Sequence, residues 1–182
     1  MQAEQIGQME TILDEDAPRL AITSILLVEH RVLRELMQAM ERALLANTPA
    51  EALRERAAML EVALDRHATR EEEQLLSPLR TRSERARHLV EMMEIVHDEV
   101  RGLFEQVQSD SNPKNKLWTI LEMTEAHFER EEQEVFPLAR SLMPIDELSQ
   151  LIAGNRIEGA HSLRRDKDTQ GPTELIALAN GG

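Results

Sequence analysis

The chain has 182 residues, of which 41% are hydrophobic, 2% are aromatic and none is cysteine, and its formal net charge is −13. This length is sufficient for one domain with a substantial core. The acidic excess argues against nucleic-acid binding, which needs basic patches, and the lack of cysteine excludes disulfides, thiol catalysis and thiolate metal sites.

Four stretches with apolar residues three and four positions apart predict four long helices. They cover approximately residues 18–46, 50–79, 83–108 and 114–143. Loop signals at Asn47-Thr48-Pro49 lie between the first and second helices, and those at residues 109–113 lie between the third and fourth. Ser83 is a suitable N-cap for the third helix. Because proline removes a backbone hydrogen bond and crowds the preceding turn, we expect Pro137 to kink the fourth helix.

Helices of this length with short connections predict an all-α fold, an up-down-up-down antiparallel four-helix bundle. The shortage of aromatic residues also favours packed helices over β-sheets. We expect an N-terminal arm at residues 1–17, the bundle with a short C-terminal helix (145–153) at residues 18–153, and a flexible tail at residues 154–182. No apolar run approaches the ~20 residues of a membrane span and no signal peptide is evident, so the expected location is cytoplasmic.

Six titratable residues fall on the inward, otherwise apolar faces of these helices: His30, His67, Glu71, His97, His127 and Glu131. Burying an unpaired polar group costs ~2–7 kcal/mol, whereas a whole domain is stable by only ~5–15 kcal/mol. A bound cation would compensate all six, and the four-residue spacing of each His-x-x-x-Glu pair places both side chains on one helix face. The pattern therefore predicts a metal site, with a metal-free network of histidines and glutamates as the structural alternative.

The sequence around these residues is repeated. Leu-Val-Glu-His30-Arg-Val-Leu-Arg resembles Glu-Ile-Val-His97-Asp-Glu-Val-Arg, and His67-Ala-Thr-Arg-Glu71-Glu matches His127-Phe-Glu-Arg-Glu131-Glu. The bundle should therefore have approximate twofold symmetry. Histidine and carboxylate without sulfur suit iron, manganese or zinc. Two symmetric halves, each with two histidines and a glutamate, suggest two metals bridged by the glutamates.

Other polar residues weigh less. A ferritin-like dimetal site requires Glu-x-x-His twice, and Glu94 with His97 is the only such pair, so that alternative is disfavoured. Glu94 is still a candidate hydrogen-bond partner for His97. We expect Glu72 and Glu132 on the solvated face, with a candidate role in iron access, and His88 on the surface.

The arrangement of one histidine, His-x-x-x-Glu, one histidine and His-x-x-x-Glu on successive helices resembles the hemerythrin-like (HHE cation-binding) domain family, over roughly residues 20–145. The resemblance implies a non-heme centre of two Fe ions with a bridging oxo or hydroxo group. It implies that four histidines hold the iron and two glutamates bridge it: His30, His67, His97, His127, Glu71 and Glu131.

The chain departs from the oxygen-carrying members of that family. These have a second histidine one turn along the third helix, where this chain has Met93 and Arg101 on either side of His97, and a final His-x-x-x-x-Asp motif, where this chain ends in Glu131. Fewer histidines leave more open iron positions, so we predict a di-iron protein that reacts with or senses O2, NO or peroxide, with Met93 lining the small-molecule pocket.

The sequence is compatible with more than one function. Peroxidase- or oxidase-type turnover is neither predicted nor excluded. The alternatives are iron storage, buffering or delivery, in which the tail would bind a protein partner, and a bundle with structural zinc. No nucleic-acid or membrane partner is expected.

Overall fold

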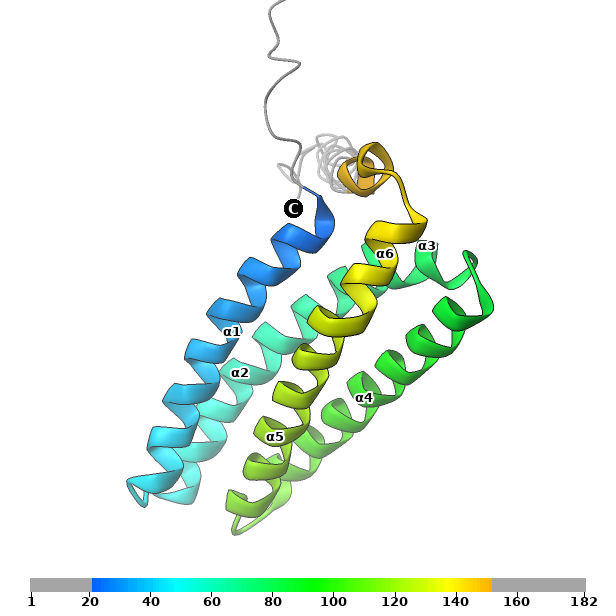
Figure 1. The fold of residues 1–182 in the computed structure, drawn as a ribbon. Coiled ribbons are helices and arrows are strands. Elements are labelled where there is room, and N and C mark those ends of the chain that lie inside the picture. The colour runs from blue at the N-terminus through cyan, green and yellow to red at the C-terminus, as the bar shows by residue number, and fades with distance from the viewer. Residues whose placement is uncertain (1–20, 152–182) are drawn as a thin grey trace, which may run out of the picture.

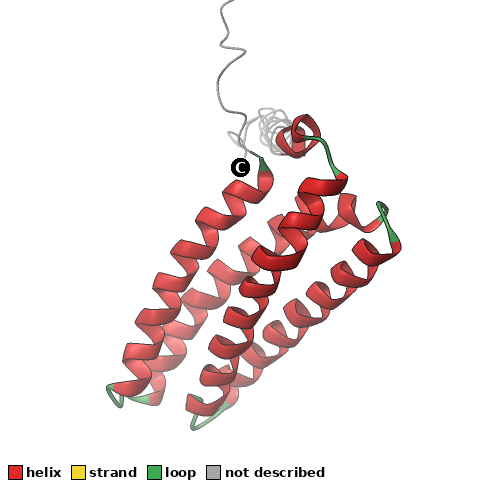
Figure 2. Ribbon diagram, viewed as in Figure 1, coloured by secondary structure: helices red, strands yellow, loops and turns green. Residues whose placement is uncertain are grey.

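The computed structural model describes residues 21–151 of the chain (Figure 1). All regular structure in this range is helical, and none of the described residues forms a strand (Figure 2). The elements, in chain order, are α1 (Ile22–Leu45), α2 (Ala50–Glu71), the π-helical segment η1 (Glu72–Leu76), α3 (Ser77–Arg80), α4 (Glu84–Ser109), α5 (Lys114–Arg130), the π-helical segment η2 (Glu131–Val135) and α6 (Phe136–Leu142). The predicted all-α class is confirmed.

The helix ends follow the local capping and turn signals. Ser83 caps α4 as predicted, because its hydroxyl accepts a hydrogen bond of 3.0 Å from the Ala86 backbone N–H. After α1, Asn47 has a φ of 54°, a left-handed conformation that asparagine adopts more readily than most residues. Pro49 then precedes the first residue of α2. These local preferences fix the short connections that bring consecutive helices together.

Two of the predicted long helices each contain a π-helical segment. α2, η1 and α3 follow one another without a loop, as do α5, η2 and α6. Pro78 and Pro137 each occupy the start of the α-helical segment that follows. Because proline cannot donate a hydrogen bond to the preceding turn, a wider π turn lets the helix continue past it. We expected a kink at Pro137; the structure places the departure from α geometry before the proline, and repeats it before Pro78.

The long helical segments pack side by side (Figure 1), with α1 against α2 and α5, and α4 against α2 and α5. Their apolar faces form two separate buried clusters. One includes Ile22, Leu75 and Phe136, and the other includes Leu44 and Leu117. The six predicted site residues lie between the two clusters, so a polar layer divides the core.

The ends of the described range agree in part with the sequence. A helix over residues 145–151 packs its buried Leu148 against the first of the two clusters. The predicted arm (1–17), the first residues of the first predicted helix (18–20) and the predicted tail (154–182) lie outside the described residues. None of the helices that are described is both long and apolar enough to cross a membrane.

Candidate metal centre

The structure brings all six predicted site residues together in the polar layer. Five different elements contribute them, and every one is buried, with Glu71 and Glu131 at 0% exposure. Their nitrogen and oxygen atoms form two groups, in each of which the atoms lie within 4.8 Å of one another. One group contains His30, His67 and Glu131; the other contains Glu71, His97, His127 and Glu131. Glu131 is therefore shared, whereas Glu71 belongs to one group only.

The histidines form two pairs, and in each pair the two rings meet edge to face, at interplanar angles of 72° and 67°. In the first pair, His30 Nε2 lies 3.1 Å from His67 Nε2, and in the second pair His97 Nε2 lies 2.8 Å from His127 Nε2. Each pair joins a histidine from the first helix of one sequence repeat to one from the second helix. The approximate twofold symmetry predicted from the repeat is present in this pairing.

Carboxylates hold three of the four imidazoles by their other nitrogen. His30 Nδ1 lies 2.8 Å from Glu132, His67 Nδ1 lies 2.9 Å from Glu29, and His97 Nδ1 lies 2.7 Å from Glu72. An ionised carboxylate only accepts hydrogen bonds, so Nδ1 must carry the proton. In the first pair this leaves two Nε2 lone pairs facing each other when both rings are neutral. A cation between them would turn that repulsion into coordination, the arrangement in which a carboxylate orients a metal-bound histidine.

The two buried glutamates lack hydrogen-bond partners. No oxygen of Glu71 or Glu131 accepts a hydrogen bond within the described structure. Glu131 does approach imidazole nitrogens, at 2.6 Å from His127 Nε2 and 3.2 Å from His30 Nε2, but without the alignment of a hydrogen bond. A buried carboxylate left in this state is costly. Oxygens and nitrogens that converge on shared points without bonding one another fit a metal ion.

The ionisation states also suit metal binding. Burial, with the neighbouring imidazole of the same pair, lowers the pKa of His67 and of His97 to about 4, so both are neutral at pH 7 and offer lone pairs. Burial and the negative charge of Glu131 raise the pKa of the Glu71 carboxyl well above its usual range. Burial opposes ionisation of Glu131 as well, but the facing His127 and His30 outweigh it and hold the pKa of Glu131 well below its usual range.

Glu72 and Glu132 have a more specific position than the sequence suggested. We expected both on the solvated face, yet they are only 30% and 29% exposed and they accept the hydrogen bonds from His97 and His30. Arg101 and Arg34, each four residues after one of those histidines, bind the same two carboxylates at 3.2 Å and 2.7 Å. The signal was available in the sequence, because each of these glutamates directly follows a buried site glutamate in the repeat.

Two smaller expectations were tested at the same site. Glu94 forms an ion pair with Arg80 and no hydrogen bond with His97, so its predicted role was wrong: Nδ1 of His97 binds Glu72 at the start of η1 instead. His88 is exposed, as predicted. Glu29, which holds His67, was missed because it lies on a different helix from its partner.

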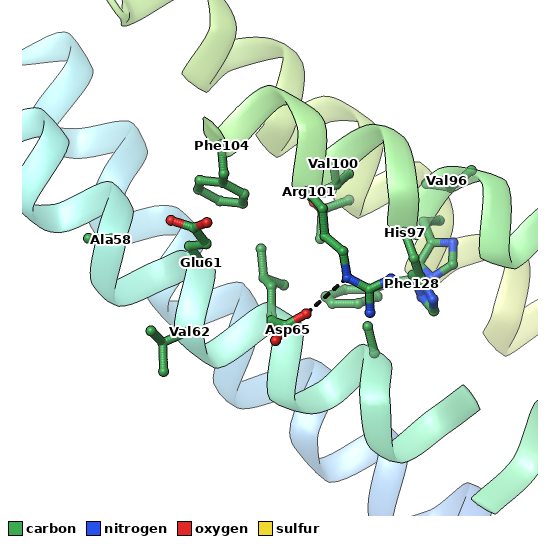
Figure 3. A pocket seen from close by; sticks show the side chains of 14 residues that line it. Ala58, Glu61, Val62, Asp65, Val96, His97, Val100, Arg101, Phe104 and Phe128 are labelled. Carbon is green, nitrogen blue, oxygen red and sulfur yellow. Dashed lines mark hydrogen bonds and ion pairs between the residues drawn. The ribbon is translucent and has the colours of Figure 1, made fainter. Parts of the chain in front are cut away.

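A cavity of about 360 Å³ adjoins the second histidine pair (Figure 3). His97, His127 and Arg101 contribute to its lining, together with apolar residues from α2, α4 and α5. Met93 does not line it; this residue is fully buried in the apolar core, because its position on α4 faces the cluster beyond the polar layer.

Comparison with known proteins gives one match. The model of the hemerythrin HHE cation binding domain family matches residues 21–139, which is more than half of the chain and includes all six site residues. No curated protein and no solved structure gives a significant match.

Proposed function

The chain belongs to the hemerythrin HHE cation-binding domain family, and from this premise we propose that its histidine–glutamate cluster holds two iron ions and meets O2, NO or peroxide at an open iron position. The family membership accounts for a domain that binds metal cations. Iron, the number of ions and the reaction with small oxidants are the proposal.

The observation that carries the proposal is the set of four buried carboxylate oxygens without hydrogen-bond partners, in Glu71 and Glu131. They lie among four imidazoles whose nitrogens gather in two groups. Each group contains two histidines and at least one carboxylate. This donor set is typical of non-heme iron sites in which some coordination positions of the iron stay open. The shared Glu131 supports two neighbouring metal positions with a common carboxylate.

The surrounding bundle supports a fixed site. We infer an antiparallel up-down-up-down arrangement of four long helical segments, which is supported by the short loops and by the contacts of α1 and α4 with both α2 and α5. Such a framework places ligands from facing helices at one depth of the core. The π segments begin at or directly after Glu71 and Glu131, where they set the direction of these carboxylates.

Other residues of the chain orient the ligands and exclude water. Glu29, Glu72 and Glu132 fix the ring orientation of three histidines through Nδ1. On the first pair, Phe128 stacks on the His30 ring with 4.1 Å between centroids, which seals that side. When bound, iron supplies a redox-active Lewis-acidic centre with vacant coordination positions.

Metal analysis of the native protein tests the proposal. Full-length protein purified without chelators should contain about two iron ions per chain and show an oxo-to-iron absorption band that changes with peroxide, azide or NO. Glu131→Ala should abolish both iron and band, whereas the matched variant Glu134→Ala, on the same π segment but 45% exposed, should keep both.

Three results would contradict it. Native protein with zinc alone would indicate a structural zinc bundle. Iron that mild chelation removes, with no spectral response to peroxide, azide or NO, would indicate storage or buffering. Protein without metal even after reconstitution would leave the histidine–glutamate network as a purely structural feature.

A further inference from the structure

We propose that the cavity beside the second histidine pair is a binding site for a neutral, largely apolar organic molecule with one hydroxyl group, whose oxygen accepts a hydrogen bond from His127 Nδ1. This inference goes beyond the proposed function, because it concerns a molecule larger than O2, NO or peroxide. It does not require that the bound metal be iron.

The cavity lies where the internal symmetry is broken. In the repeat, Glu29 and Val96 occupy equivalent positions, each directly before a site histidine. Glu29 accepts the hydrogen bond from His67 Nδ1 at 2.9 Å. Its counterpart Val96 cannot accept one, and His127 Nδ1, the nitrogen equivalent to that of His67, is buried without a partner. Of the four imidazoles, His127 alone lacks a carboxylate on Nδ1 among the described residues.

A second polar atom without a partner lies on the same helix. Thr124 is three residues before His127, and its counterpart in the repeat, three residues before His67, is Leu64. The Thr124 hydroxyl is buried, with the side chain 4% exposed, and forms no hydrogen bond in the described structure. Both Thr124 and His127 line the cavity. Buried polar groups normally have partners, so two orphans facing one cavity indicate a ligand with a polar end.

The size and the walls of the cavity define the rest of that ligand. A volume of about 360 Å³ is in the range of small-molecule sites and well above the ~30 Å³ of one water. The walls are mainly aliphatic and aromatic, with side chains that include Val96, Val100, Phe104 and Phe128 (Figure 3). These surfaces suit an apolar body of several carbon atoms.

Charges at the cavity favour a neutral molecule. Arg101 is the one arginine or lysine of the lining, and its guanidinium already binds Asp65 at 2.9 Å (Figure 3). It also binds Glu72 at 3.2 Å. Glu61 adds a further carboxylate to the lining. An anion would be repelled by this negative excess. A cationic group such as an ammonium only donates hydrogen bonds, so it could not accept one from the His127 N–H at the polar end. A hydroxyl group can accept from the imidazole N–H and also bond the threonine hydroxyl.

The test compares p-cresol with toluene on full-length, zinc-loaded protein, which is diamagnetic and redox-silent. NMR titration should show that p-cresol binds about tenfold or more tightly than toluene, since the two differ only in the hydroxyl that would satisfy the orphan atoms. In protein with ¹⁵N-labelled histidine, p-cresol should shift the His127 Nδ1 resonance and leave that of His67 unchanged. The same titration on metal-free protein shows whether binding depends on the metal.

Two variants and matched controls locate the site. Val96→Glu restores the symmetric acceptor and should weaken p-cresol binding at least about tenfold, and Val100→Phe should do the same by filling the cavity. Val32→Glu and Val32→Phe make the same changes at an exposed position of α1 and should leave binding as in the wild type.

Equal affinity for p-cresol and toluene, an unchanged His127 signal, or wild-type binding in folded Val96→Glu and Val100→Phe would each overturn the proposal and leave ordered water as the partner of the two orphan atoms. If both variants fail to fold, the affinities of the wild type for p-cresol and toluene and the shift of its His127 Nδ1 resonance still test the proposal. The iron content of the native protein is measured separately. Native protein without iron that binds p-cresol once loaded with zinc would contradict the proposed function alone, and native protein with iron that does not bind p-cresol once loaded with zinc would contradict this inference alone.

Discussion

The two histidine pairs share one sequence pattern but differ in how their rings are held. In the first pair both imidazoles donate Nδ1–H to carboxylates, and Phe128 stacks on one of them. In the second pair only His97 has such a carboxylate, and a cavity adjoins His127. The first pair is thus held by carboxylates at both rings, and the second at one ring only. A pocket of about 290 Å³, lined in part by His67 and Glu29, adjoins the first pair too, so the difference lies in the support of the rings.

The difference arises from very few residues. Arg34 with Glu132 around the first pair is matched by Arg101 with Glu72 around the second. The symmetry fails at Glu29, which is replaced by Val96. A duplicated metal-binding framework can therefore keep its ligands and free one imidazole N–H for another partner through a change next to a ligand. The following variants separate what the two halves share from what distinguishes them.

Each histidine pair with its carboxylates forms one half of the candidate metal centre. The largest effect should come from the carboxylate that belongs to both halves. Glu131 is part of both groups of candidate ligand atoms, whereas Glu71 is part of the group with His97 and His127 only. Glu131→Ala should therefore lose metal from both halves, and Glu71→Ala should retain about one ion per chain, held by His30 and His67. Metal content by mass spectrometry measures this. Equal losses in the two variants would show that both glutamates bridge equally.

Acid should act on both halves alike in the metal-free protein. The pKa of His67 and of His97 is about 4 in the folded chain, against about 6.5 when unfolded. Between these values the unfolded state binds more protons, so stability is present above about pH 6.5 and is lost as pH falls toward 4. Each histidine should contribute about 3 kcal/mol to this loss.

Urea unfolding of metal-free protein across that pH range checks the prediction. His97→Gln should remove about half of the pH dependence that the two histidines produce. His88→Gln, at an exposed position, should leave the dependence unchanged. The raised pKa of Glu71 acts in the opposite direction, so the comparison with the variant decides: a pH dependence in His97→Gln equal to that of the wild type would contradict the prediction.

Replacing Glu29 by valine, the residue at the equivalent position 96, should weaken metal binding less than the loss of a glutamate ligand does. Glu29→Val leaves His67 Nδ1 without its acceptor, and loss of such a supporting carboxylate typically costs 10–100-fold in metal affinity. Competition with a chelator measures the affinity. Glu29 also forms an ion pair with Arg70, so Arg70→Met serves as the control for that contact. If the two variants bind metal equally well, the hydrogen bond to His67 is not the cause.

Much of this site could be predicted from the sequence because each ligand candidate interrupts an apolar helix face. His30, for example, lies four residues after Leu26 and three before Leu33, both buried, so its inward direction follows from helical periodicity alone. Helical periodicity also placed the four long helices, and the preference of serine for N-cap positions placed the cap at Ser83.

Partners across helices could not be predicted in this way. Glu94 was the natural candidate for His97 because it lies one turn away on the same helix, but the ring faces Glu72 on a neighbouring element. The cavity depends on several side chains from three helices, and no periodicity locates it. The π segments depend on where the helix accommodates Pro78 and Pro137, which a proline alone does not specify.

The smallest effect should distinguish the two matching arginines. Arg34 and Arg101 are partly exposed, at 25% and 35%, so each replacement by methionine should cost about 1 kcal/mol of stability or less. Only Arg101 lies in the cavity lining, where its bond to Asp65 joins α4 to α2 (Figure 3). Breaking that link should let p-cresol exchange faster in Arg101→Met, whereas Arg34→Met should exchange it as the wild type does. NMR line shapes measure both rates. Equal exchange in the two variants would show that the ion pair does not control access to the cavity, so that the difference between the two histidine pairs would rest on the loss of the acceptor at Val96 alone.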